Sequence, residues 1–360
     1  MCVRHIFMIR QIASLVGLAL LFGVGTLSAQ ERPADDPIKV ETKLVSIPTI
    51  VSDRDGRYIP NLAATDFTVL QDGVPQKIEF FAATEEPITV ALLIDTSQST
   101  RPVLGDIKDS AKSFIKLLGP RDRAMVVSFD FDTHILSPLT NDQEELKKAI
   151  KSAEIPKQEP GTTLRDAVFQ TVNESFRGLT GRKAIILLTD GKDFGSRIAT
   201  RELLSKLEES DTLIYTIYFK TEEGQRRIFD RFPRGGGRRN GGVFGGGGRR
   251  FPGGGGQFPP VSRPNGRSDT RRERVEEQNL LAEEFLQKLS DLTAGRLYPS
   301  KNGKLENTFA SIVDELRFQY RLGFYPTEET NTKTLHELKV KVSRPDTVVR
   351  SRGSYRNRTN

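Results

Sequence analysis

The chain has 360 residues, which is enough for one large domain or two medium ones. It contains one cysteine, Cys2, so it cannot form an internal disulfide or a cysteine-ligated zinc site. The net charge is +7, but residues 224–274 contain thirteen arginines and three acidic residues, a net charge of +10, so the rest of the chain carries −3. The basic character therefore belongs to one segment and not to the whole protein.

The first residues have the pattern of a secretory signal. Basic residues, the last of them Arg10, precede an uncharged apolar run at 12–27, and the small residues Ser28 and Ala29 follow it. This pattern predicts cleavage after Ala29. The alternative is an uncleaved membrane anchor, but the run of about 16 residues is shorter than the ~20 needed to span a bilayer. We expect residues 1–29 to be a signal peptide, the protein to be exported to the periplasm or the outside medium, and no transmembrane segment to remain.

Residues 30–86 read as short strands. An apolar, β-branched stretch at 44–51 and a second one at 67–70 have no helical period. The pair Asp72-Gly73 is a strong signal for a tight hairpin turn. We predict a small N-terminal β unit.

From Pro87 onward the pattern changes to alternating strands and helices. Helical periodicity separates and follows the apolar runs, for example at 107–118 and 164–176. Runs this continuous are typical of strands covered on both faces, as in a parallel sheet. The four strongest runs are 88–94, 125–129, 184–188 and 213–219. The alternation predicts a doubly wound α/β domain with a mostly parallel sheet over residues 87–318.

A segment rich in glycine, arginine and proline, 224–274, interrupts this domain after its fourth apolar run. Such a composition buries too little apolar area to offset the entropy of ordering, so we predict a disordered insert. The C-terminal segment, 319–360, returns to β character. We expect it to pair with the N-terminal strands as a small flanking β unit.

Three turns rich in oxygen side chains follow predicted strands or precede a predicted helix. They supply Asp95, Ser97 and Ser99 from the first turn, Thr162 from the second, and Asp190 from the third. In an open α/β sheet, ligands bind beyond the carboxyl ends of the strands. Hard oxygen donors suit Mg²⁺, with Mn²⁺ or Ca²⁺ as less selective alternatives. Two carboxylates leave the shell to be completed by water or by an acidic group of a ligand, which favours adhesion through a shared cation.

These turns, Asp-x-Ser-x-Ser, Gly-Thr and Thr-Asp-Gly, resemble in order and spacing the metal-ion-dependent adhesion site (MIDAS) of von Willebrand factor type A (VWA) domains. The resemblance covers residues 87–318 without the insert. It implies a VWA, Rossmann-like fold and assigns Thr162 as a ligand in preference to Thr163, because the family's ligand directly follows the glycine. The complete set that it implies is Asp95, Ser97, Ser99, Thr162 and Asp190. The flanks resemble exported bacterial proteins related to this family, whereas the insert is a departure from the family pattern.

Competing enzymatic motifs are incomplete. The sequence Asp-Phe-Asp at 130–132 is similar to the aspartate pair of a phosphatase family, but His134 stands where a threonine or valine is required. The Asp-Phe-Gly sequence at 193–195 lacks the other motifs of a kinase. No Gly-x-Ser-x-Gly motif accompanies either His134 or His336. We therefore expect no enzymatic activity.

Two functions follow from these observations. The first is an exported adhesion or protein-interaction module that binds an acidic group of an unidentified partner protein through a Mg²⁺-type ion. The alternative is a cell-surface protein that binds a polyanion, such as an anionic glycan, an anionic lipid or extracellular DNA, through the arginines of the insert. In that case the metal site is structural.

Overall fold

The computed structural model places most of the chain after residue 43 in one compact unit, Lys43–Asn360. The residues that it describes are 44–83, 86–157, 161–221, 266–300, 305–326 and 334–357. The predicted signal peptide, 1–29, and residues 224–265 of the predicted insert lie outside this range. Among the helices that are described, none combines the length and apolar character needed to cross a bilayer.

The centre of this unit is a six-stranded sheet with the order β10-β9-β8-β5-β6-β7. All neighbours are parallel except β7, which runs antiparallel to β6. The strands are β5 (Ile88–Asp95), β6 (Arg123–Phe129), β7 (Thr133–Thr140), β8 (Arg182–Thr189), β9 (Leu213–Tyr218) and β10 (Leu297–Pro299). The four apolar runs of the sequence form β5, β6, β8 and β9, so that prediction is confirmed. Every residue of β5 and β8 is buried, as expected for strands covered on both faces.

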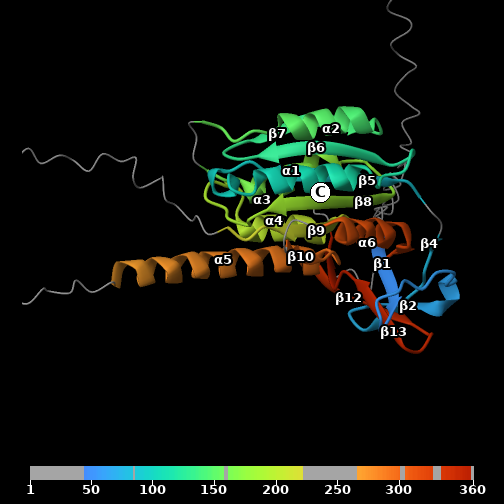
Figure 1. Cartoon of the computed structure of the whole chain (residues 1–360). Coiled ribbons are helices and arrows are strands. Elements are labelled where there is room, and N and C mark those ends of the chain that lie inside the picture. Colours follow the sequence, from blue (N-terminus) through green and yellow to red (C-terminus); the bar gives the residue numbers. More distant parts are fainter. Residues whose placement is uncertain are drawn as a thin grey trace, which may run out of the picture. The chain divides into compact units, whose positions relative to one another are not determined.

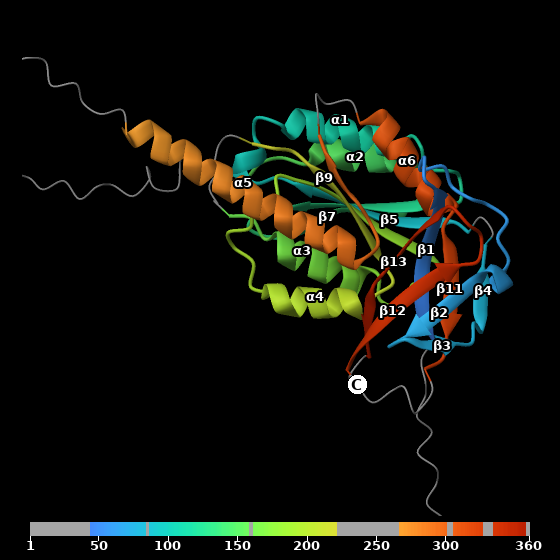
Figure 2. The same ribbon diagram turned by 90° about the horizontal axis from the view of Figure 1, so that it is seen from below.

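Helices cover both faces of this sheet (Figures 1 and 2). One face packs against α1 (Leu104–Ile115), α2 (Gln143–Ser152) and α6 (Glu306–Arg317). The other packs against α3 (Leu164–Gln170), α4 (Thr200–Glu208) and α5 (Gly266–Leu292). Side chains alternate between two apolar cores along β5, because Leu92 faces the α1 side and Leu93 the α3 side. The predicted doubly wound α/β fold is confirmed.

The strand order reverses between β5 and β8. After β5 the chain passes through α1 to β6 on one side of β5, whereas after β8, on the other side, it passes through α4 to β9. Since α1 and α4 cover opposite faces, the loops that leave β5 and β8 diverge. Such a switch point, at the carboxyl ends of two adjacent parallel strands, is the usual ligand site of an open α/β sheet.

The flanking β unit contains two antiparallel four-stranded sheets, with the orders β13-β1-β11-β4 and β14-β12-β2-β3. The strands are β1 (Val45–Asp53), β2 (Phe67–Gln71), β3 (Val74–Gln76), β4 (Phe80–Ala82), β11 (Tyr320–Phe324), β12 (Leu335–Val342), β13 (Thr347–Ser351) and β14 (Ser354–Arg356). N-terminal and C-terminal strands alternate as neighbours, with β1 between β11 and β13 and β2 beside β12. The expected pairing of the two ends of the chain is confirmed.

The predicted hairpin turn joins β2 to β3. Its two central residues have positive φ, +48° at Asp72 and +84° at Gly73. Two successive left-handed residues match the right-handed twist of the flanking strands, and aspartate and glycine tolerate this conformation best.

One predicted boundary is wrong. Helix α5 begins at Gly266, inside the predicted insert 224–274, so residues 266–274 are helical. After Gly266 this stretch contains no glycine or proline and is rich in arginine, a good helix former. Arginine is dense up to residue 274, but the glycines and prolines that oppose helix formation end at Gly266.

Helix α2 and strand β7 are additional elements that the sequence reading missed. The start of α2 is capped by Asp142, whose carboxylate accepts hydrogen bonds from the backbone N–H groups of Glu144 and Glu145 at 2.8 and 3.1 Å. Strand β7 is an edge strand, and most of its residues are partly or fully exposed. An edge strand lacks the continuous apolar run by which the inner strands were recognised.

A buried carboxylate joins the α/β domain to the β unit. Glu315, on α6, is completely buried and accepts a 2.6 Å hydrogen bond from Tyr215 on β9. It also accepts a hydrogen bond from Arg350, on β13, and lies 3.6 Å from the guanidinium of Arg296. Tyr58, which follows β1, donates to its second oxygen at 3.3 Å. Removal of this carboxylate would leave two guanidinium groups without their anion.

We expect Glu315→Ala to lower the free energy of unfolding by about 3–5 kcal/mol, because a buried charge network loses its central partner. Urea unfolding measures the change. Glu306→Ala, an exposed glutamate at the start of the same helix, is the matched control and should cost less than about 1 kcal/mol. Equal losses in the two variants would show that Glu315 does not hold the two parts together.

Candidate metal centre

The first of the three turns begins at the last residue of β5. The carboxylate of Asp95 accepts a hydrogen bond from the backbone N–H of Ser97 at 2.9 Å, which folds the turn back on itself. The hydroxyl of Thr100 donates to the backbone oxygens of Asp95 and Ser97, at 3.1 and 2.9 Å. The hydroxyls of Ser97 and Ser99 lie 3.1 Å apart. The turn therefore presents one carboxylate and two neighbouring hydroxyls on a short, internally bonded loop.

The third turn lies beside the first because β8 is the parallel neighbour of β5. Ile94 is paired with Leu188, so the next residues along the two strands are Asp95 and Thr189. The Thr189 hydroxyl donates to Asp95 at 2.5 Å and accepts from the backbone N–H of Gly191 at 2.9 Å. Asp190 is thereby held next to Asp95. Sheet register, and not a long-range loop, brings the two predicted carboxylates together.

Only glycine fits the position after Asp190. Gly191 has a φ of +73°, and a Cβ at this position would lie 2.7 Å from the side chain of Leu286 on α5. Both the left-handed backbone and the close approach of α5 favour a residue without a side chain. The Thr-Asp-Gly sequence therefore reflects the packing of α5 as well as the placement of the carboxylate.

The second turn is held to the other two by backbone hydrogen bonds. The backbone oxygen of Thr162 accepts from the N–H groups of Phe194 and Gly195, at 3.1 and 3.0 Å, which follow the third turn. The next residue, Thr163, donates its N–H to the oxygen of Asp130 at 2.7 Å. The carboxylate of Asp130 in turn accepts from Thr96, in the first turn, at 3.0 Å. The five predicted ligands thus belong to three turns that are bonded to one another.

The donor set fits a small hard cation. It contains two carboxylates and three hydroxyls, all oxygen ligands. Neighbouring ligands of an octahedral Mg²⁺ lie about 2.9 Å apart, and those of the larger Ca²⁺ are separated by about 3.3 Å or more. The 3.1 Å between the hydroxyls of Ser97 and Ser99 lies between these values and is compatible with either ion. No group of three or more histidine, cysteine or acidic side chains suited to a metal occurs in the described part of the chain, so these hydroxyls are essential to any such site.

Most of the proposed ligand side chains are buried. Asp95, Ser97, Thr162 and Asp190 are buried, and Ser99 is half-buried. Burial and, to a smaller extent, the nearby carboxylate of Asp190 raise the pKa of Asp95 to about 7, against the opposing effect of the hydrogen bonds from Ser97 and Thr189. Without a cation, the protein bears the cost of two buried carboxyl groups side by side. A bound cation would relieve that cost.

The sequence reading missed a buried lysine at this centre. The ammonium of Lys192 lies 3.1 Å from the Asp190 carboxylate and 2.5 Å from the hydroxyl of Thr221, which donates to the same carboxylate at 2.7 Å. The Lys192 side chain is 1% exposed. Asn279, on α5, donates to the backbone oxygen of Thr221 at 3.1 Å. A lysine two residues after an aspartate gives no sequence signal of burial, because the burying groups come from distant segments.

Two exposed aromatic side chains flank the Thr162 turn. Phe131 is 42% exposed and Phe194 is 47% exposed. A Cβ added at Gly161 would lie 2.8 Å from the ring of Phe131, and Phe194 donates its N–H to Thr162. Large apolar side chains on a surface beside a binding centre are typical contact residues for a partner.

The enzyme-like motifs have local structural roles. Asp193 accepts hydrogen bonds from the hydroxyl of Ser196 at 2.6 Å and from the backbone N–H of Arg165 at 3.0 Å. His134 is half-exposed, 3.5 Å from Asp130, and His336 is completely buried in the β unit beside Asp72. The two histidines lie in different parts of the fold, one on β7 and one on β12.

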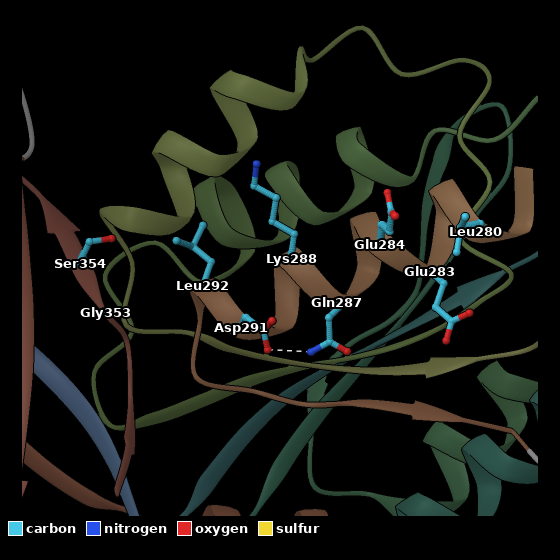
Figure 3. Close-up of a pocket in the computed structure, with 9 residues that line it drawn as sticks. All are labelled: Leu280, Glu283, Glu284, Gln287, Lys288, Asp291, Leu292, Gly353 and Ser354. Atoms are coloured by element: carbon cyan, nitrogen blue, oxygen red, sulfur yellow. Dashed lines mark hydrogen bonds between the residues drawn. The ribbon is translucent and has the colours of Figure 1, made fainter. Parts of the chain in front are cut away.

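An open depression of about 680 Å³ lies outside this centre, along the outer face of α5 (Figure 3). Its lining includes Glu283, Glu284 and Asp291 of α5 and reaches Ser354 of β14. The opposite face of α5 carries Leu286, which packs against Gly191. The depression is therefore separated from the three turns by the helix itself.

Sequence comparison agrees with this geometry. Residues 90–192, which run from β5 to just beyond the Thr-Asp-Gly turn, match the profile of the von Willebrand factor type A domain. The protein contains a von Willebrand factor type A domain. VWA domains are generally interaction modules and not enzymes. Comparison with curated protein sequences gives no match.

Several solved structures are similar to this chain. BatB, a conserved hypothetical protein from Bacteroides thetaiotaomicron, is 18% identical over 64% of this chain and 98% of its own, with a TM-score of 0.41. A von Willebrand factor type A protein from Catenulispora acidiphila is 14% identical over 76% of this chain and 51% of its own, with a TM-score of 0.43. Proximal thread matrix protein 1 from the mussel byssus, with a zinc-occupied MIDAS motif, is 16% identical over 68% and 49%, with a TM-score of 0.43.

The raised pKa of Asp95 predicts a pH dependence of stability. In the folded, metal-free protein this pKa is about 7, against 3.8 for an ordinary aspartate, so the protonated form stabilises the fold. That contribution is complete at low pH and is lost as the pH rises through about 7. We expect Asp95→Asn, which cannot ionise, to gain stability relative to the unchanged protein between about pH 5 and about pH 8 in EDTA. Thermal unfolding at both pH values tests this, and a constant difference would contradict it.

Proposed function

We propose that this VWA domain is an interaction module of an exported protein and binds an acidic group of a partner protein through a Mg²⁺-type ion. The proposed ligands are those named above, Asp95, Ser97, Ser99, Thr162 and Asp190. Mn²⁺ and Ca²⁺ are alternative ions. The observation that carries the proposal is the hydrogen bond from Thr189 to Asp95, because it fixes the two carboxylates next to one another at the switch point of the sheet.

An external acidic ligand follows from the composition of the centre. With one oxygen from each residue, the two aspartates and three hydroxyls supply five protein oxygens, whereas Mg²⁺ prefers six. The remaining position is available to water or to a carboxylate of the partner. The ion would act there as a shared cation between two proteins, a role that polarises no bond and requires no catalytic residue.

The surface beside the centre supports a protein partner. Phe131 and Phe194 are exposed and both residues contact the Thr162 turn, so apolar neighbours of an acidic residue bound at the ion could pack against these rings. Aromatic residues are enriched in the cores of protein–protein interfaces. An acidic residue flanked by apolar side chains is the partner sequence that we expect.

The proposal of export depends on the N-terminal pattern at 1–29, and the polyanion alternative depends on the arginines of the insert 224–274. Residues 1–29 and residues 224–265 of the insert lie outside the described residues. The alternative therefore enters as an outcome of the binding experiment below.

Metal binding is the first test. Calorimetry of the protein with Mg²⁺ should show one site, and Asp95→Ala or Asp190→Ala should abolish it, because either change removes one of only two anionic ligands. Asp132→Ala is the matched control, since this exposed carboxylate lies in the neighbouring turn after β6 and should leave binding unchanged. Binding that survives both substitutions would disprove the assigned site.

Partner binding separates the two functions. If the metal makes the contact, EDTA should release the partner and moderate salt should not, because bulk ions screen a buried carboxylate–cation bond poorly. Phe194→Ser should then weaken binding by about tenfold, since one exposed ring is lost from the contact. If the arginines make the contact, the affinity for the partner should fall steeply with increasing salt concentration and should not change on addition of EDTA. A capture experiment from the envelope of the exporting cell, with EDTA and with salt, distinguishes these outcomes.

The matched variants act on each contact separately. Ser97→Ala combined with Ser99→Ala should mimic EDTA. Glutamine in place of four paired arginines of the insert should mimic salt, and these arginines are Arg238, Arg239, Arg249 and Arg250. Binding that is insensitive to both sets of substitutions would exclude both functions.

A further inference from the structure

We propose that Lys192 makes metal binding at this centre depend on an anionic ligand. The two aspartates alone would neutralise a divalent ion, and the ammonium of Lys192 adds a fixed positive charge to them. This inference rests on the proposed function. It assigns to Lys192 a role in selecting the ligand, which is distinct from the role of the five residues proposed to hold the ion.

The first step of the argument is the position of the lysine. Its ammonium lies 3.1 Å from the carboxylate of Asp190 and 2.5 Å from the hydroxyl of Thr221. The side chain is almost completely buried, as is Asp190, so solvent does not screen the pair. The charge is also fixed in place, because Thr221 is itself held by Asn279 of α5. Lys192 therefore cannot turn out to solvent without breaking two hydrogen bonds.

The second step is the charge of the loaded centre. Asp95 and Asp190 together carry two negative charges, which would balance a divalent cation. Lys192 adds one positive charge, so the ion, its two proposed carboxylate ligands and this ammonium sum to +1; the buried carboxylate of Asp130, which is bonded to Thr96, is not among the proposed ligands. Excess charge in a region of low dielectric is unfavourable, and a bound carboxylate removes it. Water can fill the open coordination position, but it cannot neutralise the charge.

The third step is the sharing of Asp190. Its second oxygen already accepts hydrogen bonds from Lys192 and Thr221, and its first accepts from the backbone N–H of Lys192 at 3.2 Å. A carboxylate bonded in this way has less charge to donate to a cation. Lys192 should therefore lower the affinity for the ion when no acidic ligand is present. It should also increase the factor by which the ion and the acidic ligand raise the affinity for each other. By linkage, each of the two then increases the affinity for the other by the same factor.

The test uses Mg²⁺ alone and Mg²⁺ with acetate, a soluble carboxylate, at the same ionic strength set with chloride. For the unchanged protein we expect acetate to tighten Mg²⁺ binding several-fold in calorimetry. Acetamide, which is neutral and similar in shape, should have no effect. In Lys192→Gln, Mg²⁺ alone should bind at least about tenfold more tightly, because a like charge next to the cation is gone. The effect of acetate should largely disappear.

Two further variants separate charge from packing. Thr221→Val removes the hydroxyl that holds the ammonium but keeps its charge, so the acetate effect should remain. Lys192→Met is a second neutral substitution of similar length, which serves if glutamine prevents folding, as judged by thermal unfolding. Lys147→Gln removes a lysine that is paired with Glu144 on α2 and controls for the change in net charge.

The possible outcomes are distinct. If neither the unchanged protein nor any variant binds Mg²⁺, the proposed function itself is refuted. Mg²⁺ binding that is equal or weaker in Lys192→Gln and Lys192→Met, with the acetate effect retained, would overturn the role of Lys192 alone. A Thr221→Val variant that behaves like Lys192→Gln would attribute the effect to the hydrogen-bond network and would also overturn it.

Discussion

Two carboxyl groups, Asp95 and Asp190, are buried side by side, and the surrounding structure has to compensate for their mutual repulsion. Some of the compensating donors are close in sequence to the carboxyl group that they serve, and others come from the neighbouring strand end. Ser97 donates its backbone N–H to Asp95, Thr189 donates its hydroxyl to the same side chain, and Lys192 pairs with Asp190. The short motifs around the two aspartates are therefore units of charge compensation as well as sets of proposed metal ligands.

Much of this centre could be predicted from the sequence, because its position follows from strand order. Apolar runs locate the strands, and polar turns after parallel strands meet at one edge of a sheet. Lys192 could not be predicted in the same way, since its burial depends on Thr221 and Asn279, which stand on opposite sides of the insert in the sequence. The exposed ring of Phe194 is a similar case, because only the structure shows that it lies beside Thr162.

The same limit applies to the fold. The inner strands and the pairing of the chain's two ends follow from hydrophobic pattern, whereas the edge strand β7 has no such pattern. Helix α5 begins inside the predicted insert because glycine and proline oppose helix formation, arginine does not, and neither glycine nor proline occurs between Gly266 and residue 274. Glu315 is buried by partners from β9, β13 and the turn after β1, and no local pattern marks a glutamate for such a place.

The β unit gives the folding of this protein a fixed order. Strand β1 has no sheet neighbours until β11 and β13 are available, since Val45 pairs with Phe324 and Thr49 with Ser351. A nascent chain that has completed only the α/β domain still lacks both sheet neighbours of β1. Contacts so distant in sequence form late, and the unit cannot close while the chain is incomplete. The N-terminal strand of the β unit therefore stays without its sheet neighbours until the C-terminal strands have been synthesised.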